Sequence, residues 1–442
     1  MIKLPEQVNK AICLLKNSGF EAYAVGGAVR DCLLGKVPFD WDITTSARPE
    51  ETEKVFCGER IIETGIKHGT VTVIIDGMPL EITTYRIDGD YTDHRHPQTV
   101  SFSDNLRDDL SRRDFTINTL CCNCDDKIID VFGGKDDLKN KTIRCVGDPD
   151  TRFSEDALRI MRAVRFSAEL GFKIEKSTSD SILKNRQLLS DVSKERLQVE
   201  FTKLITGKHA TDVIRKYHAV IEVFIPELAP LAECEQHTKY HKYDVFEHTL
   251  HAVDAIDFND RILRLTMFFH DFGKPDAKTT DENGTSHFKG HAAISEKKTR
   301  DILKRLKFDN NTINEVSKLV LIHDMKSPRD KIQAKKMMCS LGDETYLNLI
   351  KIKRADNMAK ADPHAIDEKL KNMLSFYEEI KASNECYNLK SLAVNGDDIK
   401  AFGIAEGKEI KSSLDFLLNG VIEGKCQNRK DVLLEYLKEN TK

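Results

Sequence analysis

The stretch AYAVGGAVRDCLLGKVPFDWDITT, residues 22–45, decides the fold of the first part of the chain. A short β-favouring segment at 22–25 runs into Gly26 and Gly27, and a helical segment containing Arg30 follows. Glycines after a strand let the backbone approach a ligand closely, and the start of a helix offers free N–H groups to a phosphate. The pattern predicts a strand, a tight turn and a helix, with Gly27 and Arg30 as candidate phosphate contacts. Taken alone, a Gly-Gly turn is equally compatible with no ligand.

Two acidic residues in the same stretch, Asp40 and Asp42, flank Trp41. On a β-strand, residues i and i+2 point to the same face, so we expect the two carboxylates side by side. Such a pair is unfavourable unless a cation neutralises it, and carboxylates are usual ligands of Mg²⁺. Glu81, in a later β-favouring segment, is placed to supply a third acid. The pattern predicts a magnesium site; two exposed turn carboxylates are the simpler alternative.

The strand-like signal is confined almost entirely to the first ~145 residues. Short β-favouring stretches punctuated by Gly, Pro and Asp occupy 22–25, 41–44, 70–75, 80–85 and 116–121. Beyond residue 148, apolar residues recur with helical spacing at 154–170, 193–204, 260–270 and 295–306. The sequence therefore predicts an α+β head, a mixed β-sheet with flanking helices, followed by an all-α remainder.

Length and composition exclude several classes of protein. The 442 residues are 40% hydrophobic and 32% charged, which is ordinary for a soluble globular protein of about three domains. No apolar run approaches the ~18 residues of a membrane span, and residues 1–10 have no apolar signal core. Transmembrane, secreted and collagen-like proteins are therefore excluded. The net charge of −4 requires any phosphate-binding surface to be local.

The cysteines indicate a reducing compartment. Eleven is an odd number without framework spacing, so at least one stays unpaired and a cytoplasmic location is expected. Cys121 and Cys124 form a C-x-x-C with Cys122 between them, but no second pair follows at matching spacing. Buried strand thiols are therefore expected here, rather than a zinc site.

An arginine-rich segment follows the head. Arg112-Arg113-Asp114 comes first, and residues 152–159 then read RFSEDALR, in which Ser154 is a candidate helix N-cap. Three arginines recur at every third position of the predicted helix, Arg159, Arg162 and Arg165. A solvated charged helix is the simple alternative to a binding surface.

These motifs together resemble one family closely, the class II tRNA nucleotidyltransferases, or CCA-adding enzymes. The ordered matches span roughly the first 205 residues and comprise Gly26-Gly27-x-x-Arg30-Asp31, Asp40-x-Asp42, Arg112-Arg113-Asp114, Glu155-Asp156-x-x-Arg159 and Glu195-Arg196-x-x-x-Glu200. The resemblance implies that the 3′-hydroxyl of a tRNA attacks the α-phosphate of CTP or ATP and releases pyrophosphate. It also implies that Asp40 and Asp42 hold Mg²⁺ with help from Glu81, and that Gly27, Arg30 and Arg113 contact the nucleotide.

Base selection is then expected from Asp156 and Arg159. Cytosine and adenine each present an amino donor beside a ring-nitrogen acceptor, and a carboxylate beside a guanidinium offers the reverse pattern. Guanine and uracil would instead place a carbonyl against the carboxylate. If the two side chains lie one helical turn apart in one plane, they can accept CTP and ATP and reject GTP and UTP. Arg162 and Arg165 are expected to serve the phosphates and to orient the pair.

The segment 86–97, RIDGDYTDHRHP, is similar to the flexible loop that CC-adding members of the family lack. It favours full CCA addition, or addition of A alone in an organism with split activities. A charged loop containing glycine can also act as a lid. A plain surface loop is the alternative.

The middle of the chain is rich in histidines beside aspartates, which is typical of a divalent-metal site. The pattern resembles the HD phosphohydrolase superfamily, whose metal ligands are matched by His248, His270, Asp271 and Asp356. His291 and His323 are candidates for a second metal, and a divalent transition metal is expected. A helical spacer that has kept the fold and lost hydrolysis is the alternative.

The resemblance divides the chain into four domains: a nucleotidyltransferase head at 1–145, a helical neck and body at 146–235, an HD-type domain at 236–360 and a helical tail at 361–442. The helical regions are expected to bind the acceptor and T arms of tRNA by shape and phosphate contacts. No membrane partner is expected, and the sequence does not reveal an oligomeric state. Three other functions are weaker alternatives. A bacterial poly(A) polymerase tends to have a long basic tail, whereas residues 434–442 are short and mixed in charge. The intact arginine and base-reading motifs argue against an HD signalling hydrolase with an inactive head, and the presence of both Asp40 and Asp42 argues against a non-catalytic RNA-binding protein.

Overall fold

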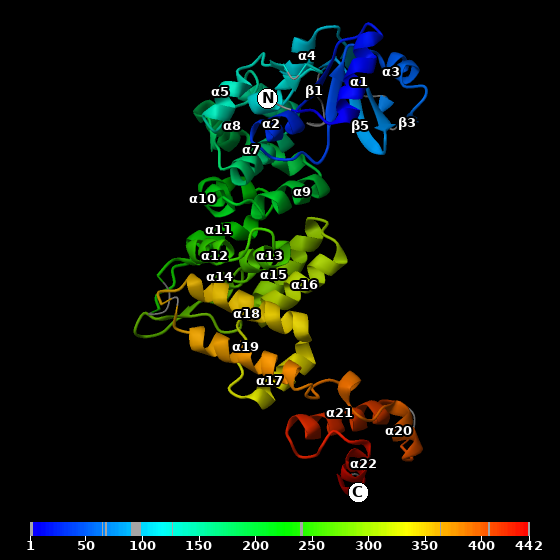
Figure 1. The fold of residues 1–442 in the computed structure, drawn as a ribbon. Coiled ribbons are helices and arrows are strands. Elements are labelled where there is room, and N and C mark those ends of the chain that lie inside the picture. The colour runs from blue at the N-terminus through cyan, green and yellow to red at the C-terminus, as the bar shows by residue number, and fades with distance from the viewer. Residues whose placement is uncertain are drawn as a thin grey trace. The chain divides into compact units, whose positions relative to one another are not determined.

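A computed structural model describes residues 3–440, apart from 64, 67–68, 90–98, 126, 239–241, 363 and 405–406. The chain forms two compact units, Met1–Ala229 with Arg305–Lys307, and Pro230–Lys304 with Phe308–Lys442 (Figure 1). We call them the N-terminal and the C-terminal unit. The predicted fold class, an α+β head followed by a helical remainder, is confirmed. Within the described part of the chain, no helix combines the length and the apolar character that a bilayer crossing requires.

The head alternates strands with short helices. Its elements are α1 (Glu6–Asn17), β1 (Ala22–Val25), α2 (Gly27–Leu33), β2 (Asp42–Thr45), α3 (Pro49–Val55), β3 (Arg60–Ile62), β4 (Thr70–Ile75), β5 (Met78–Thr84), β6 (Arg86–Asp88), β7 (Val100–Phe102), α4 (Leu106–Ser111), β8 (Cys121–Cys122), β9 (Ile128–Ile129) and α5 (Gly134–Lys139). The described residues form a seven-stranded sheet in the order β3-β4-β5-β2-β1-β8-β9. Only β2 and β5 are parallel; the other neighbouring strands of this sheet are antiparallel.

The two faces of this sheet are covered by different helices, because side chains alternate along each strand. On one face, Ala22 and Ala24 of β1 pack with apolar residues of α1 and α2 and with Ile43 of β2. On the other face, Val25 packs with Leu110 of α4. Asp42 and Thr44 alternate with the core residue Ile43, so they lie on the face that α4 covers.

The predicted strands are confirmed with one exception. The predictions for 22–25 and 70–75 match β1 and β4, and those for 41–44 and 80–85 overlap β2 and β5. The strand predicted at 116–121 is wrong, because Thr116–Asn118 form a 3₁₀ turn and only Cys121–Cys122 pair as a strand. Asn118 donates to Oδ1 of Asp114, and such local side-chain bonds compete with strand pairing. All eleven cysteines are free. Cys121 and Cys122 are buried on β8, as expected of strand thiols, whereas Cys124 is half-buried in the turn that follows, so for Cys124 the prediction is wrong.

The neck is helical and contains a break that the sequence did not predict. Its elements are β10 (Thr142–Ile143), α6 (Pro149–Glu155), α7 (Leu158–Leu170), β11 (Lys173–Ile174), α8 (Lys176–Asn185), α9 (Lys194–Ile205), α10 (Ala210–Ile221) and α11 (Ala229–Ala232). The single helix predicted at 154–170 is wrong, because Asp156 has extended backbone, φ −135° and ψ 102°, between α6 and α7. Its Oδ1 accepts from the amide of Leu158 at 3.1 Å and so starts a new helix. Asp148, and not Ser154, caps the preceding helix.

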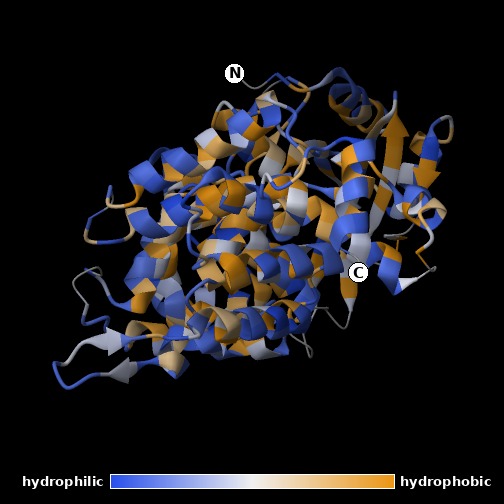
Figure 2. Ribbon diagram, turned by 90° about the horizontal axis from the view of Figure 1, so that it is seen from below, coloured by the Kyte–Doolittle hydropathy of each residue, from blue (hydrophilic) through white to orange (hydrophobic). Residues whose placement is uncertain are grey.

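The C-terminal unit is a helical assembly. Its elements are α12 (Val245–Asp254), α13 (Arg261–Phe269), α14 (Lys274–Ala277), β12 (Thr279–Thr280), β13 (Ser286–His287), α15 (His291–Arg305), α16 (Asn310–Ile322), α17 (Lys331–Leu341), α18 (Asp343–Met358), α19 (Asp367–Ala382), α20 (Gly396–Ala401), α21 (Lys408–Ile422) and α22 (Lys430–Asn440). The helices predicted at 260–270 and 295–306 are confirmed in α13 and α15, as is that at 193–204 in α9. Figure 2 shows hydrophobic and hydrophilic residues alternating around most helices, as expected of helices that each bury one face. Aspartate side chains cap α12, α13, α16 and α17, which fixes where these helices begin.

Candidate functional site

The turn between β1 and α2 brings a glycine against charged side chains. Gly26 has φ +84°, a backbone conformation that L side chains rarely adopt. A Cβ at Gly26 would lie 3.3 Å from Nη1 of Arg113 and 3.6 Å from Oδ2 of Asp42. Glycine is therefore favoured by the backbone angle, and a Cβ would also crowd the Arg113 guanidinium. Gly27 then opens helix α2, where backbone N–H groups have no helical partner.

The acids Asp42 and Glu81 lie side by side because β2 and β5 are parallel and the two residues are register partners. Asp40 is exposed and lies two residues before β2 begins, so the expectation that Asp40 and Asp42 share one strand is wrong. Burial raises the pKa of Asp42 to about 6; Arg113 opposes this shift, and Glu81 and Asp40 reinforce it. The structure thus gathers the three predicted acids at one place. Their mutual repulsion makes the place suitable for a cation.

Arg113 is held beside this acid cluster by a buried carboxylate. Its Nη2 lies 3.5 Å from Oδ2 of Asp109, whose side chain is fully buried. Asp109 also accepts from the Thr44 hydroxyl at 2.9 Å and from Nη2 of Arg112 at 2.6 Å. Burial alone would raise the pKa of Asp109, but Arg113 and Arg112 outweigh it and the pKa is lowered. Asp109 therefore fixes α4 to β2 and keeps Arg113 next to Asp42.

Arg30, a predicted phosphate contact, is buried. Its Nη1 donates to Oδ1 of Asn118 at 2.7 Å and its Nε to Oδ1 of Asp31 at 2.9 Å. The guanidinium also lies 4.8 Å from the centre of the Phe166 ring. These contacts join α2 to the turn at Thr116–Asn118 and to α7. The contact of Arg30 with a triphosphate stays a prediction.

The predicted base-reading residues, Asp156 and Arg159, have different partners in the structure. Oδ2 of Asp156 accepts from Nη2 of Arg196, on α9, at 2.8 Å. Arg159 donates to Oε2 of Glu155 at 2.6 Å and to the carbonyl of Arg112 at 2.7 Å. The expectation that the pair shares one helix is wrong, because Asp156 lies before α7 begins. Sequence reasoning gives Arg196 no role, since forty residues separate it from Asp156 and no local pattern links them.

Arg165 is buried and Arg162 is half-buried, and both make ion pairs within the N-terminal unit. Nε of Arg162 donates to Oδ2 of Asp114 at 2.9 Å, and Nε of Arg165 lies 2.6 Å from Oε2 of Glu200. Both guanidinium groups also lie over the ring of Phe166, at 5.3 and 3.7 Å from its centre. Burial alone would raise the pKa of Asp114, but Arg162 holds it below its usual range. An orienting role is thus supported by contacts, and a phosphate role stays a prediction.

The segment 86–97 lies partly outside the described residues, which omit 90–98. On either side of the omitted residues, β6 and β7 pair as antiparallel strands. The reading of this segment as the loop of a full CCA-adding enzyme therefore stays a prediction.

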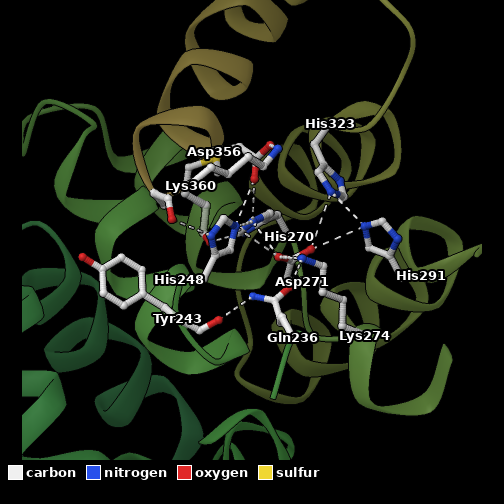
Figure 3. A network of polar contacts seen from close by, with 12 residues as sticks. Gln236, Tyr243, His248, His270, Asp271, Lys274, His291, His323, Asp356 and Lys360 are labelled. Carbon is white, nitrogen blue, oxygen red and sulfur yellow. Dashed lines mark hydrogen bonds and ion pairs between the residues drawn. The ribbon is translucent and has the colours of Figure 1, made fainter. Parts of the chain in front are cut away.

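The C-terminal unit contains a buried cluster of histidines and aspartates, contributed by α12, α13, α15, α16 and α18 or by residues at their ends (Figure 3). Nε2 of His248 lies 3.0 Å from Oδ1 of Asp356 and 3.4 Å from Oδ2 of Asp271. Nε2 of His270 lies 3.1 Å from Oδ2 of Asp271. The four residues that match the HD pattern thus meet at one point, although more than a hundred residues of chain separate the first from the last.

A second group shares the same aspartate. Oδ1 of Asp271 lies 3.4 Å from Nε2 of His291 and 3.7 Å from Nε2 of His323. Nδ1 of each histidine donates to the carbonyl three residues earlier, which directs the Nε2 atoms toward Asp271. Among the described residues, neither Asp271 oxygen accepts a well-formed hydrogen bond. This donor set, with its ring tautomers fixed, fits two adjoining divalent-metal sites.

The cluster faces a cavity of about 420 Å³. Lys274 and Lys360 line this cavity together with four residues of the cluster, Asp271, His291, His323 and Asp356. Nζ of Lys274 lies 2.7 Å from Oδ2 of Asp271, and Lys360 pairs with Asp356. Two positive side chains, each paired with a carboxylate of the cluster, therefore line the cavity.

Three family descriptions match segments of this chain. They are the poly A polymerase head domain at residues 22–144, the RNA- and SrmB-binding site of polymerase A at 171–231, and tRNA nucleotidyltransferase domain 2 at 279–437. The first covers the sheet and the acid cluster. The second lies in the helical neck, and the third takes in His291, His323 and Asp356.

Several relatives match this chain over nearly its full length. The CCA-adding enzyme of Lactobacillus helveticus is 33% identical over 99% of this chain and 98% of its own length, and that of Geobacillus kaustophilus is 34% identical over 99% and 97%. The crystal structure of the Bacillus stearothermophilus CCA-adding enzyme in complex with CTP is 31% identical, has a TM-score of 0.72, and is matched over 99% of this chain and 97% of that chain. From its glycine turn and paired acids to the end of its helical remainder, the chain therefore belongs to the CCA-adding enzymes, the bacterial-type class II tRNA nucleotidyltransferases.

Proposed function

We propose that this protein adds the 3′-terminal CCA to tRNA from CTP and ATP, without a template, and releases pyrophosphate. The observation that carries the proposal is the meeting of Gly26, Asp42, Glu81 and Arg113 beside β1, β2 and β5, which are interior strands of the head sheet. Full-length similarity to CCA-adding enzymes supports it, and one such relative has been solved with CTP.

Asp40, Asp42 and Glu81 would hold the catalytic Mg²⁺. The residues fit the ion, since three carboxylates converge and burial raises the pKa of Asp42 to about 6. When bound, Mg²⁺ supplies charge stabilisation at the α-phosphate and lowers the pKa of the attacking 3′-hydroxyl. Arg113 adds a fixed positive charge beside the acids, and the start of α2 at Gly27 offers backbone N–H groups to the triphosphate.

Asp156 and Arg159 would select the base. Each carboxylate oxygen can accept two hydrogen bonds, so Asp156 can keep Arg196 and still accept the amino group of cytosine or adenine. A guanidinium has five N–H groups, and the contacts of Arg159 to Glu155 and to two backbone carbonyls use three. Held in this way, the two groups offer the acceptor and the donor that both accepted bases need.

The test is product sizing on a tRNA transcript that ends at the discriminator base. With labelled CTP alone we expect two additions, and with CTP and ATP together three. An enzyme that adds only A would leave this transcript unextended in CTP, and a poly(A) polymerase would build a long ladder from ATP.

The RNA partner is expected to meet the helical regions through phosphate and shape contacts, so the affinity for tRNA should fall as salt rises. A cytoplasmic location agrees with eleven free cysteines in the chain.

A second activity is favoured by the cluster around Asp271. We propose that His248, His270, Asp271 and Asp356 bind one divalent transition metal, and that His291 and His323 extend the site to a second. The metals would activate a water molecule for attack on phosphorus. Lys274 and Lys360 would then hold a phosphate ester in the adjoining cavity.

Hydrolysis of p-nitrophenyl phosphate and of 2′,3′-cyclic nucleotides tests this second activity, after loading with Mn²⁺, Ni²⁺ or Co²⁺. Asp271→Asn should abolish hydrolysis and leave nucleotide addition intact, whereas Asp281→Asn, on the exposed β12–β13 turn, should leave both intact. Metal-loaded protein that hydrolyses neither compound would identify the domain as a structural spacer.

A further inference from the structure

A fully exposed aromatic side chain stands immediately before the acid cluster. Phe39 is 103% exposed and Val37 is 95% exposed, about twice the fraction of any other exposed large hydrophobic residue described. Pro38, between them, fixes its own φ and restricts Val37 to extended backbone. The loop is anchored at both ends, because the amide of Lys36 donates to a carbonyl of α2 at 2.9 Å and Trp41 is buried in the head core. The backbone therefore presents Phe39 outward from a tethered loop.

The position of Phe39 next to Asp40 is the reason to give its exposure a functional meaning. Single exposed hydrophobic side chains are common and need no explanation by themselves. Phe39, however, is joined to Asp40 by a trans peptide, which places their Cα atoms about 3.8 Å apart. The ring is thus confined to the immediate neighbourhood of the acids that would hold the catalytic ion.

The occupant of this position follows from the proposed function, on which this inference rests. The attacking 3′-hydroxyl must come to the acids, and it brings the terminal nucleotide of the RNA with it. Single-stranded ends expose base faces, and these stack on aromatic side chains with little regard to sequence. We propose that Phe39 is a stacking platform for the 3′-terminal base of the RNA primer.

The subsite that holds the end of the primer must accept more than one base. During synthesis of CCA the terminal base is first the discriminator base and then cytosine, so the primer subsite must accept different bases in succession. A π face accepts every base, whereas hydrogen bonding to base edges does not. The incoming nucleotide has the opposite requirement, namely choice between bases. That role belongs to Asp156 and Arg159, so the primer, and not the incoming nucleotide, is assigned to Phe39.

Steady-state kinetics on a discriminator-ended tRNA test the proposal. Phe39→Ala should raise the KM for tRNA about 10-fold, equivalent to ~1.4 kcal/mol, with the KM for CTP unchanged. Phe39→Trp should stay within twofold of the wild type. Phe39→Leu, apolar but without a π face, should resemble alanine. Phe258→Ala removes another exposed phenylalanine, in the C-terminal unit, and should have no effect.

Fluorescence gives a direct readout. Trp41 is the only tryptophan of the chain and is buried, so Phe39→Trp adds one exposed fluorophore to a measurable background. Short single-stranded RNA should quench the added signal whatever its 3′ base, and should not change the wild-type signal.

Three results would overturn the assignment. The KM for tRNA could be unchanged in Phe39→Ala, the KM for tRNA could be the same in Phe39→Leu as in Phe39→Trp, or Phe39→Ala could raise the KM for CTP and not that for tRNA. A protein that binds Phe39 in place of RNA would give the first of these. Loss of all nucleotide addition in the wild-type protein would instead refute the proposed function itself, so the two failures are distinguishable.

Discussion

At the scale of single residues, Asp42 is expected to lower the stability of the head and to be needed for catalysis. It is half-buried beside Glu81, and desolvation raises its pKa to about 6. We expect Asp42→Asn to lower kcat for CTP incorporation at least ~10³-fold, about 4 kcal/mol, because a metal ligand is lost. The melting temperature should be equal or higher, since the substitution removes one of three crowded carboxylates.

Incorporation of labelled CMP and thermal unfolding measure the two effects. Asp104→Asn, an exposed acid of the same head, serves as the control and should change neither. If Asp42→Asn lowered both the activity and the melting temperature strongly, Asp42 would have a structural role and not a catalytic one.

Arg196 belongs to a motif that the sequence shares with the family, but only the structure shows which residue it contacts. It is the ion-pair partner of Asp156, so it fixes the carboxylate that is proposed to read the base. We expect Arg196→Gln to lower kcat/KM for CTP and ATP about 10-fold, equivalent to ~1.4 kcal/mol, and to change kcat/KM for UTP little. The preference of the enzyme for CTP over UTP should therefore become smaller. Competition between labelled CTP and UTP measures the ratio of their kcat/KM values. Arg60→Gln, at an exposed position on β3, is the control and should not change these values. If Arg196→Gln lowered kcat/KM equally for all nucleotides, Arg196 would have no part in base selection.

At the scale of elements, the attachment of α4 to β2 depends on one buried carboxylate. Asp109 accepts from Thr44 on β2 and pairs with Arg112 and Arg113. Removing the charge leaves two arginines without their buried partner, so Asp109→Asn should destabilise the head by about 3 kcal/mol at pH 7. Urea unfolding followed by Trp41 fluorescence reports on the head alone.

The pH dependence of this effect has a definite sign. Arg113 and Arg112 lower the pKa of Asp109 despite its burial. The unfolded pKa is about 3.9, so the stabilisation is fully present above that pH and is lost as the pH falls through the lower folded value. The stability difference between wild type and Asp109→Asn should thus be constant from pH 7 to 5 and shrink below about pH 4. A difference that grew on acidification would contradict the ion-pair explanation.

The elements also show what a sequence can and cannot predict. The placement of Glu81 beside Asp42 agrees with the expectation that another strand supplies a third acid. The alternation expected to pair Asp40 with Asp42 does not apply, because β2 begins only at Asp42. The break at Asp156 was missed, because the apolar spacing of α7 continues backwards past it and the break depends on contacts with Leu158 and the distant Arg196. Long-range ion pairs leave no local periodicity in a sequence.

At the scale of the whole molecule, the two proposed sites belong to different units. The acids and the base-reading residues lie in the N-terminal unit, and the cluster around Asp271 lies in the C-terminal unit. A ligand stabilises the unit that binds it by RT ln(1 + [L]/Kd), about 2.7 kcal/mol at 100 times Kd. For units of roughly 200 residues this corresponds to a shift of about 5–10 °C.

We therefore expect two separable thermal responses. Mg²⁺ with CTP should raise the midpoint seen by Trp41 fluorescence, which reports on the head because the chain has no other tryptophan. Ni²⁺, which prefers imidazole ligands to a site made of carboxylates alone, should raise a second midpoint, seen by circular dichroism of the helices and absent from the fluorescence trace. Asp42→Asn should remove the first shift alone and His270→Ala the second alone. If either substitution removed both shifts, the two sites would be coupled through the fold and the assignment of one ligand to each unit would be wrong.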